Sequence, residues 1–93
     1  MLALSSTVSR GGDLLQAQVG EELVMMSIDA GAYFGLAEVG KRIWELIERP
    51  TTVADLCARL TDEYDVPREI CETETLSFLR ELQGHGIINV VAP

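Results

Sequence analysis

The spacing of the apolar residues changes at Glu38, and this change constrains the fold more than any other feature of the sequence. Before Glu38, apolar residues lie in three short runs, at 14–19, 22–28 and 32–36, separated by turns that contain glycine. Runs of this kind are typical of antiparallel strands joined by tight turns. After Glu38, apolar residues recur every three or four positions, as on one face of a helix. The sequence therefore predicts a three-stranded meander followed by helices.

Three helices are predicted in the second half of the chain. Pro50 ends the first helix near residues 48–49, because proline cannot continue a helix. The threonine pair at 51–52 supplies a cap for the second helix. Pro67 suits the first turn of the third helix, which is expected to end at Gly84. This order of elements predicts an α+β, winged-helix-like fold, with a three-stranded antiparallel sheet followed by three helices.

The chain is expected to be a single domain, because 93 residues leave no room for two independent cores. Residues 1–13 are polar and glycine-rich toward their end, so we expect a flexible N-terminal segment there. The domain itself is expected to span residues 14–93. The apolar residues 87–91 are a candidate return strand at its end.

The charge and hydropathy of the chain disfavour several classes of partner. Seven basic and fifteen acidic side chains give a net charge of −8, and no basic stripe is visible, so we expect no nucleic acid partner. No apolar stretch approaches the roughly 20 residues needed to span a bilayer. The N-terminus lacks the basic start and long apolar run of a signal peptide. We therefore expect a cytoplasmic protein without a membrane partner.

The sequence contains no recognisable catalytic or metal-binding motif. His85 is the single histidine, and the spacing of Cys57 and Cys71 matches no zinc motif. Both cysteines are expected to be buried, unpaired residues of the core. The many carboxylates are spread over the predicted helices, as on solvated faces. We expect no catalytic residue, no metal and no cofactor.

The third predicted strand could be an edge that accepts another chain. It carries Tyr33 and Phe34 and contains neither proline nor lysine, the residues that commonly block an edge. An open edge offers unpaired N–H and C=O groups to a peptide, which can join as an extra strand. The alternative is that Tyr33 or Phe34 fills the core while the third helix covers the edge.

Much of the chain resembles the PqqD family. The resemblance is strongest over residues 20–46, which read as an apolar strand, the turn Asp29-Ala30-Gly31, the strand Tyr33-Phe34-Gly35-Leu36 and a helix that contains Gly40 and Ile43-Trp44. It continues through the segments Thr52-Val53-Ala54-Asp55-Leu56, Tyr64-Asp65-Val66, Phe78-Leu79-Arg80-Glu81-Leu82 and Gly86-Ile87-Ile88. Together these segments extend over nearly the whole chain.

The resemblance implies a RiPP recognition element, a domain that binds the leader segment of a ribosomally made precursor peptide and delivers it to modifying enzymes. Such a domain is not an enzyme, and the leader joins its third strand over a groove with the third helix. The sequence looks most like the stand-alone proteins of lasso-peptide biosynthesis, whose partner is a separate, cysteine-protease-like leader peptidase. The alternatives are a PqqD-type adaptor for a radical-SAM or other RiPP enzyme, a winged-helix transcription regulator and a small enzyme.

The predicted peptide-binding residues lie on this strand and on one stripe of the third helix. The strand contributes Ala32, Tyr33, Phe34, Gly35 and Leu36, and the absence of a side chain at Gly35 would let another backbone approach. At 100° per residue, a stripe beside the predicted core face carries Glu72, Leu76, Leu79 and Gln83. We expect Leu76 and Leu79 to floor an apolar pocket with Glu72 and Gln83 at its rim. The alternative is that Leu76 is an ordinary exposed leucine.

Overall fold

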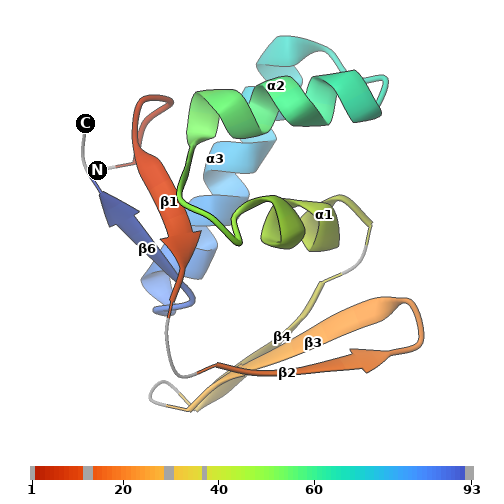
Figure 1. Ribbon diagram of the computed structural model, residues 1–93, viewed down its shortest axis with the longest axis vertical. Coiled ribbons are helices and arrows are strands. Elements are labelled where there is room, and N and C mark those ends of the chain that lie inside the picture. The colour runs from red at the N-terminus through yellow and green to blue at the C-terminus, as the bar shows by residue number, and fades with distance from the viewer. Residues whose placement is uncertain (1, 12–13, 29–30, 37, 92–93) are drawn as a thin grey trace.

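Two small antiparallel sheets and three helices surround one core in the computed structural model, which describes residues 2–11, 14–28, 31–36 and 38–91 (Figure 1). The elements are β1 (Thr7–Arg10), β2 (Leu14–Val19), β3 (Glu22–Ser27), β4 (Ala32–Leu36), α1 (Glu38–Leu46), β5 (Thr51–Thr52), α2 (Val53–Glu63), α3 (Arg68–Gly84) and β6 (Ile88–Val91). One sheet has the strand order β2-β3-β4 and the other β5-β1-β6. The predicted α+β fold, a three-stranded antiparallel sheet followed by three helices, is confirmed.

The β2-β3-β4 sheet is the predicted meander. Val19 pairs with Glu22, so Gly20 and Glu21 alone form the first turn, and Gly20 has a positive φ of 62° that suits glycine. Gly31 has a φ of 65° just before β4. The inner face of this sheet is covered by α1, and Met25 on that face is fully buried (Figure 1).

The helices begin and end close to their predicted limits. Helix α1 ends at Leu46, slightly before the predicted position near residue 48. Thr52 is the N-cap of α2, and its hydroxyl accepts a hydrogen bond of 3.1 Å from the backbone amide of Asp55. Pro67 is the N-cap of α3 and immediately precedes its first residue. No helix in the described part of the chain has the length and apolar character needed to cross a membrane.

The segment expected to be flexible, residues 1–13, contains strand β1, while residues 1, 12 and 13 lie outside the described ranges. Strand β1 is the central strand of its sheet and pairs with both β5 and β6. Val8 is fully buried, and the carbonyl of Ser6 accepts a hydrogen bond from the amide of Val53. The strand at Ile88–Val91 confirms the candidate return strand and supplies the partner that β1 needs. The domain therefore begins before residue 14.

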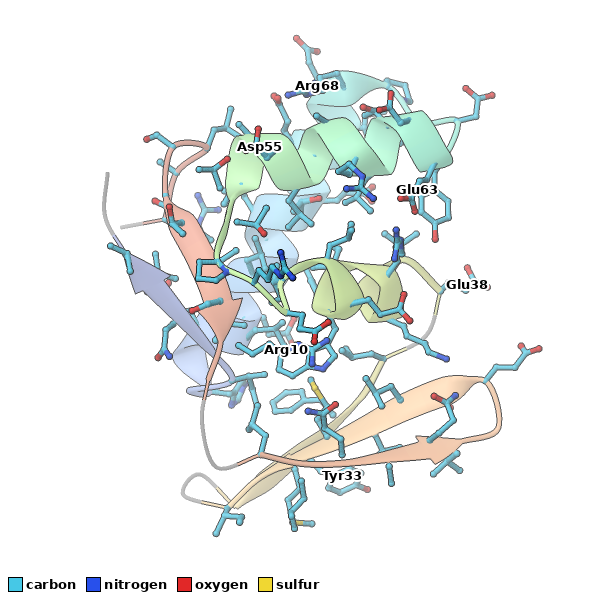
Figure 2. The ribbon with its side chains drawn as sticks, in the orientation of Figure 1. Arg10, Tyr33, Glu38, Asp55, Glu63 and Arg68 are labelled. Carbon is cyan, nitrogen blue, oxygen red and sulfur yellow. The ribbon has the colours of Figure 1, made fainter. Side chains whose placement is uncertain are left out.

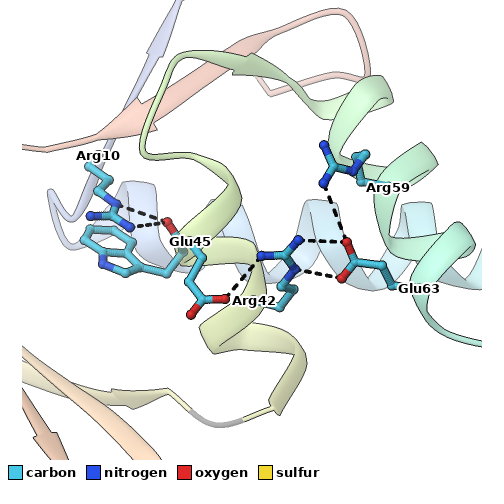
Figure 3. Close-up of polar contacts among 6 residues, drawn as sticks. Arg10, Arg42, Glu45, Arg59 and Glu63 are labelled. Atoms are coloured by element: carbon cyan, nitrogen blue, oxygen red, sulfur yellow. Dashed lines mark hydrogen bonds and ion pairs between the residues drawn. The ribbon is translucent and has the colours of Figure 1, made fainter.

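Arg10 connects β1 to α1. Its guanidinium donates hydrogen bonds of 2.8 and 3.0 Å to the backbone carbonyl of Trp44 and lies 4.7 Å from the centre of the Trp44 ring (Figure 3). The indole N–H of Trp44 donates to the Gln16 side chain on β2. Trp44 is 1% exposed, so these contacts join both sheets to α1 around one buried ring.

A second polar network joins α1 to α2. Arg42 donates hydrogen bonds of 2.7 and 2.8 Å to the two carboxylate oxygens of Glu63 and also contacts Glu45 (Figure 3). Arg59 lies 3.8 Å from the same Glu63 carboxylate. These hydrogen bonds between Arg42 and Glu63 lower the pKa of Glu63 and raise the pKa of Arg42, because they stabilise the charged form of each side chain. This network fixes the end of α2 that borders the site described next.

Candidate functional site

Strand β4 forms one edge of its sheet. It pairs with β3 alone within the described residues, so its other side has no strand partner there. On an edge strand, alternate backbone N–H and C=O groups point away from the sheet and stay available for another chain. The structure therefore places the open edge where the sequence predicts it.

Tyr33 and Phe34 point to opposite faces of β4. Tyr33 pairs with the exposed Met26, is itself 71% exposed, and lies on the side of the sheet away from the helices (Figure 2). Phe34 pairs with the buried Met25, and its ring packs against the His85 ring with 4.9 Å between their centres. The alternative is therefore correct only for Phe34, which packs against the core, while the free side of β4 has no strand partner among the described residues.

A groove of about 390 Å³ lies beside the end of β4. It is bounded by β4, by α1 and by α3, and it reaches the segment that joins α2 to α3. Its lining is almost wholly apolar and consists of Gly35, Leu36, Val39, Gly40, Ile43, Leu60, Tyr64, Val66, Cys71, Glu74, Thr75 and Phe78. An apolar hollow beside an open strand edge can hold the side chains of a peptide whose backbone bonds to that edge.

The predicted residues of β4 and those of α3 differ in their relation to the groove. Gly35 and Leu36 of β4 line the groove, whereas none of the four predicted residues of α3 does. Leu79 is 0% exposed and belongs to the core, and Leu76 is half-buried against that core. Glu72 forms an ion pair with Arg68 at 2.8 Å, while Gln83 is exposed.

The groove instead uses the opposite flank of α3. Glu74 and Phe78 lie on that flank, and Cys71 and Thr75 of the buried face also line the groove. The core face of a helix has two flanking stripes, and angular spacing alone does not say which of them faces a given strand. The prediction used the stripe with the additional leucine, whereas Glu74 and Phe78 on the other stripe line the groove together with Gly35 and Leu36 of β4.

Helix α1 and the end of α2 contribute groove residues that the sequence analysis did not assign to the site. A Cβ atom added to Gly40 would lie 3.4 Å from the ring of Phe78 and 3.7 Å from a methyl group of Leu36. A larger side chain there would occupy the groove. Glycine inside a helix is about 1 kcal/mol less favourable than alanine. A glycine inside the predicted helix was therefore a sequence signal that another side chain packs closely at position 40. Tyr64 and Val66, which follow α2, also line the groove.

The two cysteines are free and buried, as expected. The Cys71 sulfur lies 3.9 Å from the carbonyl oxygen of Cys57 and 3.9 Å from the hydroxyl of Thr75. Burial raises the pKa of the Cys57 thiol to about 11, so this thiol is protonated at neutral pH. A protonated, enclosed thiol such as Cys57 is a poor nucleophile. Cys71 is almost fully buried and lines the groove.

The comparisons with known proteins agree with this architecture. Residues 22–88, more than half of the chain, match the family model described as coenzyme PQQ synthesis protein D (PqqD). The chain belongs to the PqqD family. This membership confirms the predicted resemblance to PqqD-like RiPP recognition elements. No curated protein gives a significant match to this PqqD-family chain.

Two solved structures share the fold of this PqqD-family protein. The first is TbiB1 in complex with the TbiA(beta) leader peptide, with 29% identity, a TM-score of 0.80, and coverage of 91% of this chain and 99% of that one. The second is lasso peptide synthetase B1 complexed with the leader peptide, with 22% identity, a TM-score of 0.77, and coverage of 88% and 96%. At its lower identity, the second match shows the fold alone.

Proposed function

We propose that this PqqD-family protein binds the leader segment of a ribosomally made precursor peptide as an added strand on β4. The observation that carries the proposal is the open edge of β4 beside the apolar groove. Support comes from the similar structure of TbiB1, which is a complex with a leader peptide. The leader backbone bonds to β4, and its inward side chains enter the groove.

The geometry of strand addition explains how such a site combines affinity with selectivity. Backbone hydrogen bonds form with any extended peptide, so they supply binding without reading the sequence. Side chains of an added strand alternate between two faces, and every second one points toward α3 and the groove. The volume of about 390 Å³ lies in the range of ordinary ligand pockets, which is roughly 300–1,000 Å³. Apolar side chains are therefore selected at alternate leader positions.

The role that fits this site is delivery of the leader to a separate enzyme. The groove lining holds no histidine, and Cys71 is its one thiol, so chemistry on the precursor is assigned to the partner. We propose a cytoplasmic adaptor for the leader peptidase of a lasso-peptide pathway. The resemblance of the sequence to the stand-alone proteins of lasso-peptide biosynthesis supports this partner over a radical-SAM enzyme.

The test is a titration of the purified protein against the fluorescein-labelled leader of a precursor encoded beside its gene, followed by fluorescence polarisation. Phe78→Glu places a charge in the groove and should weaken binding on the order of 10- to 100-fold. Leu76→Glu makes the same change in charge on the opposite flank of α3 and is the matched control. Thermal melts of both variants report any loss of folded protein.

Two outcomes would contradict the proposal. Wild-type protein that does not bind the leader removes the function altogether. Equal weakening by Phe78→Glu and Leu76→Glu in folded protein moves the site away from the groove. Hydrogen exchange adds a direct readout, because the leader should slow the exchange of amides in β4 and leave those of β1 unchanged.

A further inference from the structure

The groove carries one formal charge among its lining residues, the carboxylate of Glu74. Glu74 is exposed, and within the described residues its carboxylate takes part in none of the ion pairs, unlike Glu63 and Glu72. Resting on the function proposed above, we infer that the bound peptide places a lysine or arginine against Glu74, two positions from the apolar residue that fills the groove.

The surroundings of Glu74 favour a cationic ligand. Apolar walls keep water from part of the groove, and a charge pair beside such walls interacts more strongly than one in bulk water. The net charge of −8 adds a longer-range attraction for a basic segment. An acidic residue at the same position of the peptide would be repelled by the Glu74 carboxylate and by the negative net charge of the protein.

The spacing of two positions follows from the orientation of α3 beside β4. His85 packs on Phe34, while Phe78 lies near the Cβ position of Gly40 next to Leu36, so α3 runs opposite to β4. Glu74 is one helical turn beyond Phe78, which is about 6 Å along the axis. Alternate residues of a strand are about 6.6 Å apart. A peptide residue over Phe78 therefore has its next inward neighbour over Glu74.

The direction of the peptide decides the order of the two residues. In a strand parallel to β4, the basic residue follows the apolar one, because Glu74 lies beyond Leu36 in the direction of β4. In an antiparallel strand it comes first. Either order gives a pattern of one apolar and one basic residue separated by a single position.

A displayed library of random 16-residue peptides tests this pattern without knowledge of the natural leader. The library is selected on wild-type protein, on Glu74→Lys and on Glu69→Lys. Glu69 is exposed on the same helix but does not line the groove, so its variant controls for the change in net charge. Wild type and Glu69→Lys should enrich the apolar and basic pair, and Glu74→Lys should enrich Asp or Glu at the basic position.

An enriched peptide then serves in a binding titration. Replacing its basic residue by glutamine should weaken binding to wild type about 2- to 5-fold at low salt, and much less to Glu74→Gln. The difference should shrink as ionic strength rises. Enriched peptides without a basic preference, or with the same preference in Glu74→Lys, overturn the inference and leave strand addition standing. Failure of all three proteins to enrich any peptide overturns the proposed function and this inference with it.

Discussion

Removing the side chain of Arg10 should destabilise the whole domain, because this residue ties β1 to the end of α1. Trp44, which accepts its two hydrogen bonds, lies in the last turn of α1, where carbonyl groups lack helical donors and carry the negative end of the helix dipole. The amide of Glu48 bonds to Glu45 instead. Arg10 therefore acts as a C-terminal cap supplied by a distant strand.

The loss of unfolding free energy expected for Arg10→Ala can be estimated from these contacts. Hydrogen bonds that involve a charged group contribute about 1.5–3 kcal/mol, and we count the pair once because both N–H groups share one oxygen. The contact with the Trp44 ring adds about 0.5–1 kcal/mol. Arg10 is half-buried, and water can partly replace it. Arg10→Ala should therefore lower the free energy of unfolding by about 2–3 kcal/mol.

Urea unfolding measured by far-UV circular dichroism gives this free energy, and a thermal melt should show a lower midpoint by about 4–8 °C per kcal/mol. Arg10→Lys keeps the charge but loses the forked pair of donors, so its loss should be intermediate. Arg49→Ala is the control, because Arg49 is exposed and its side chain makes no hydrogen bond or ion pair within the described residues. A loss from Arg10→Ala as small as that from Arg49→Ala would refute the reasoning.

Three further predictions concern the helices and the buried thiol. Thr52→Ala removes the N-cap of α2 and should cost about 1 kcal/mol of stability in urea unfolding, with Thr73→Ala, on the exposed surface of α3, as the control. Leu79→Ala should cost about 2–5 kcal/mol, because this side chain is 0% exposed, and Leu76→Ala should cost clearly less; equal losses would contradict the placement of the core face. The pKa of the Cys57 thiol is raised from 9.0 to about 11 in the folded protein, so the fold favours the protonated thiol. The contribution of this protonated thiol to the free energy of unfolding is therefore complete below pH 9.0 and is lost as the pH rises toward 11. Wild type should therefore lose about 1–2 kcal/mol more than Cys57→Ala between pH 8.5 and 11, and parallel pH profiles in urea unfolding would contradict the raised pKa.

The sequence predicts the meander and the three helices well, because their signals are local. Glycine turns bound the strands, Thr52 and Pro67 mark helix starts, and the apolar spacing changes near Glu38. Strand β1 has no such signal. Val8 stands alone among polar residues, and the strands that bury it come from the middle and the end of the chain.

The site is predictable only in part for a related physical reason. An edge strand without blocking residues is visible in the sequence, and Gly35 and Leu36 do line the groove. The side of α3 that faces this edge depends on how α1 and α2 carry the chain across the sheet. The prediction placed the site on the flank of α3 that carries Leu76, because Leu76 is apolar. The flank that lines the groove instead carries the charged Glu74.

The pairing of β1 with β6 has a consequence for how the chain folds during synthesis. Val8 pairs with Val90, so two strands from opposite ends of the described sequence meet in one sheet. The meander and the helices can form as they emerge from the ribosome, but β1 has no β6 to pair with until residues 88–91 are made. At bacterial and eukaryotic synthesis rates, this delay is roughly 4–16 s. Strand β1 is made before every other described strand, but until β6 is made it can pair on one side only, with β5.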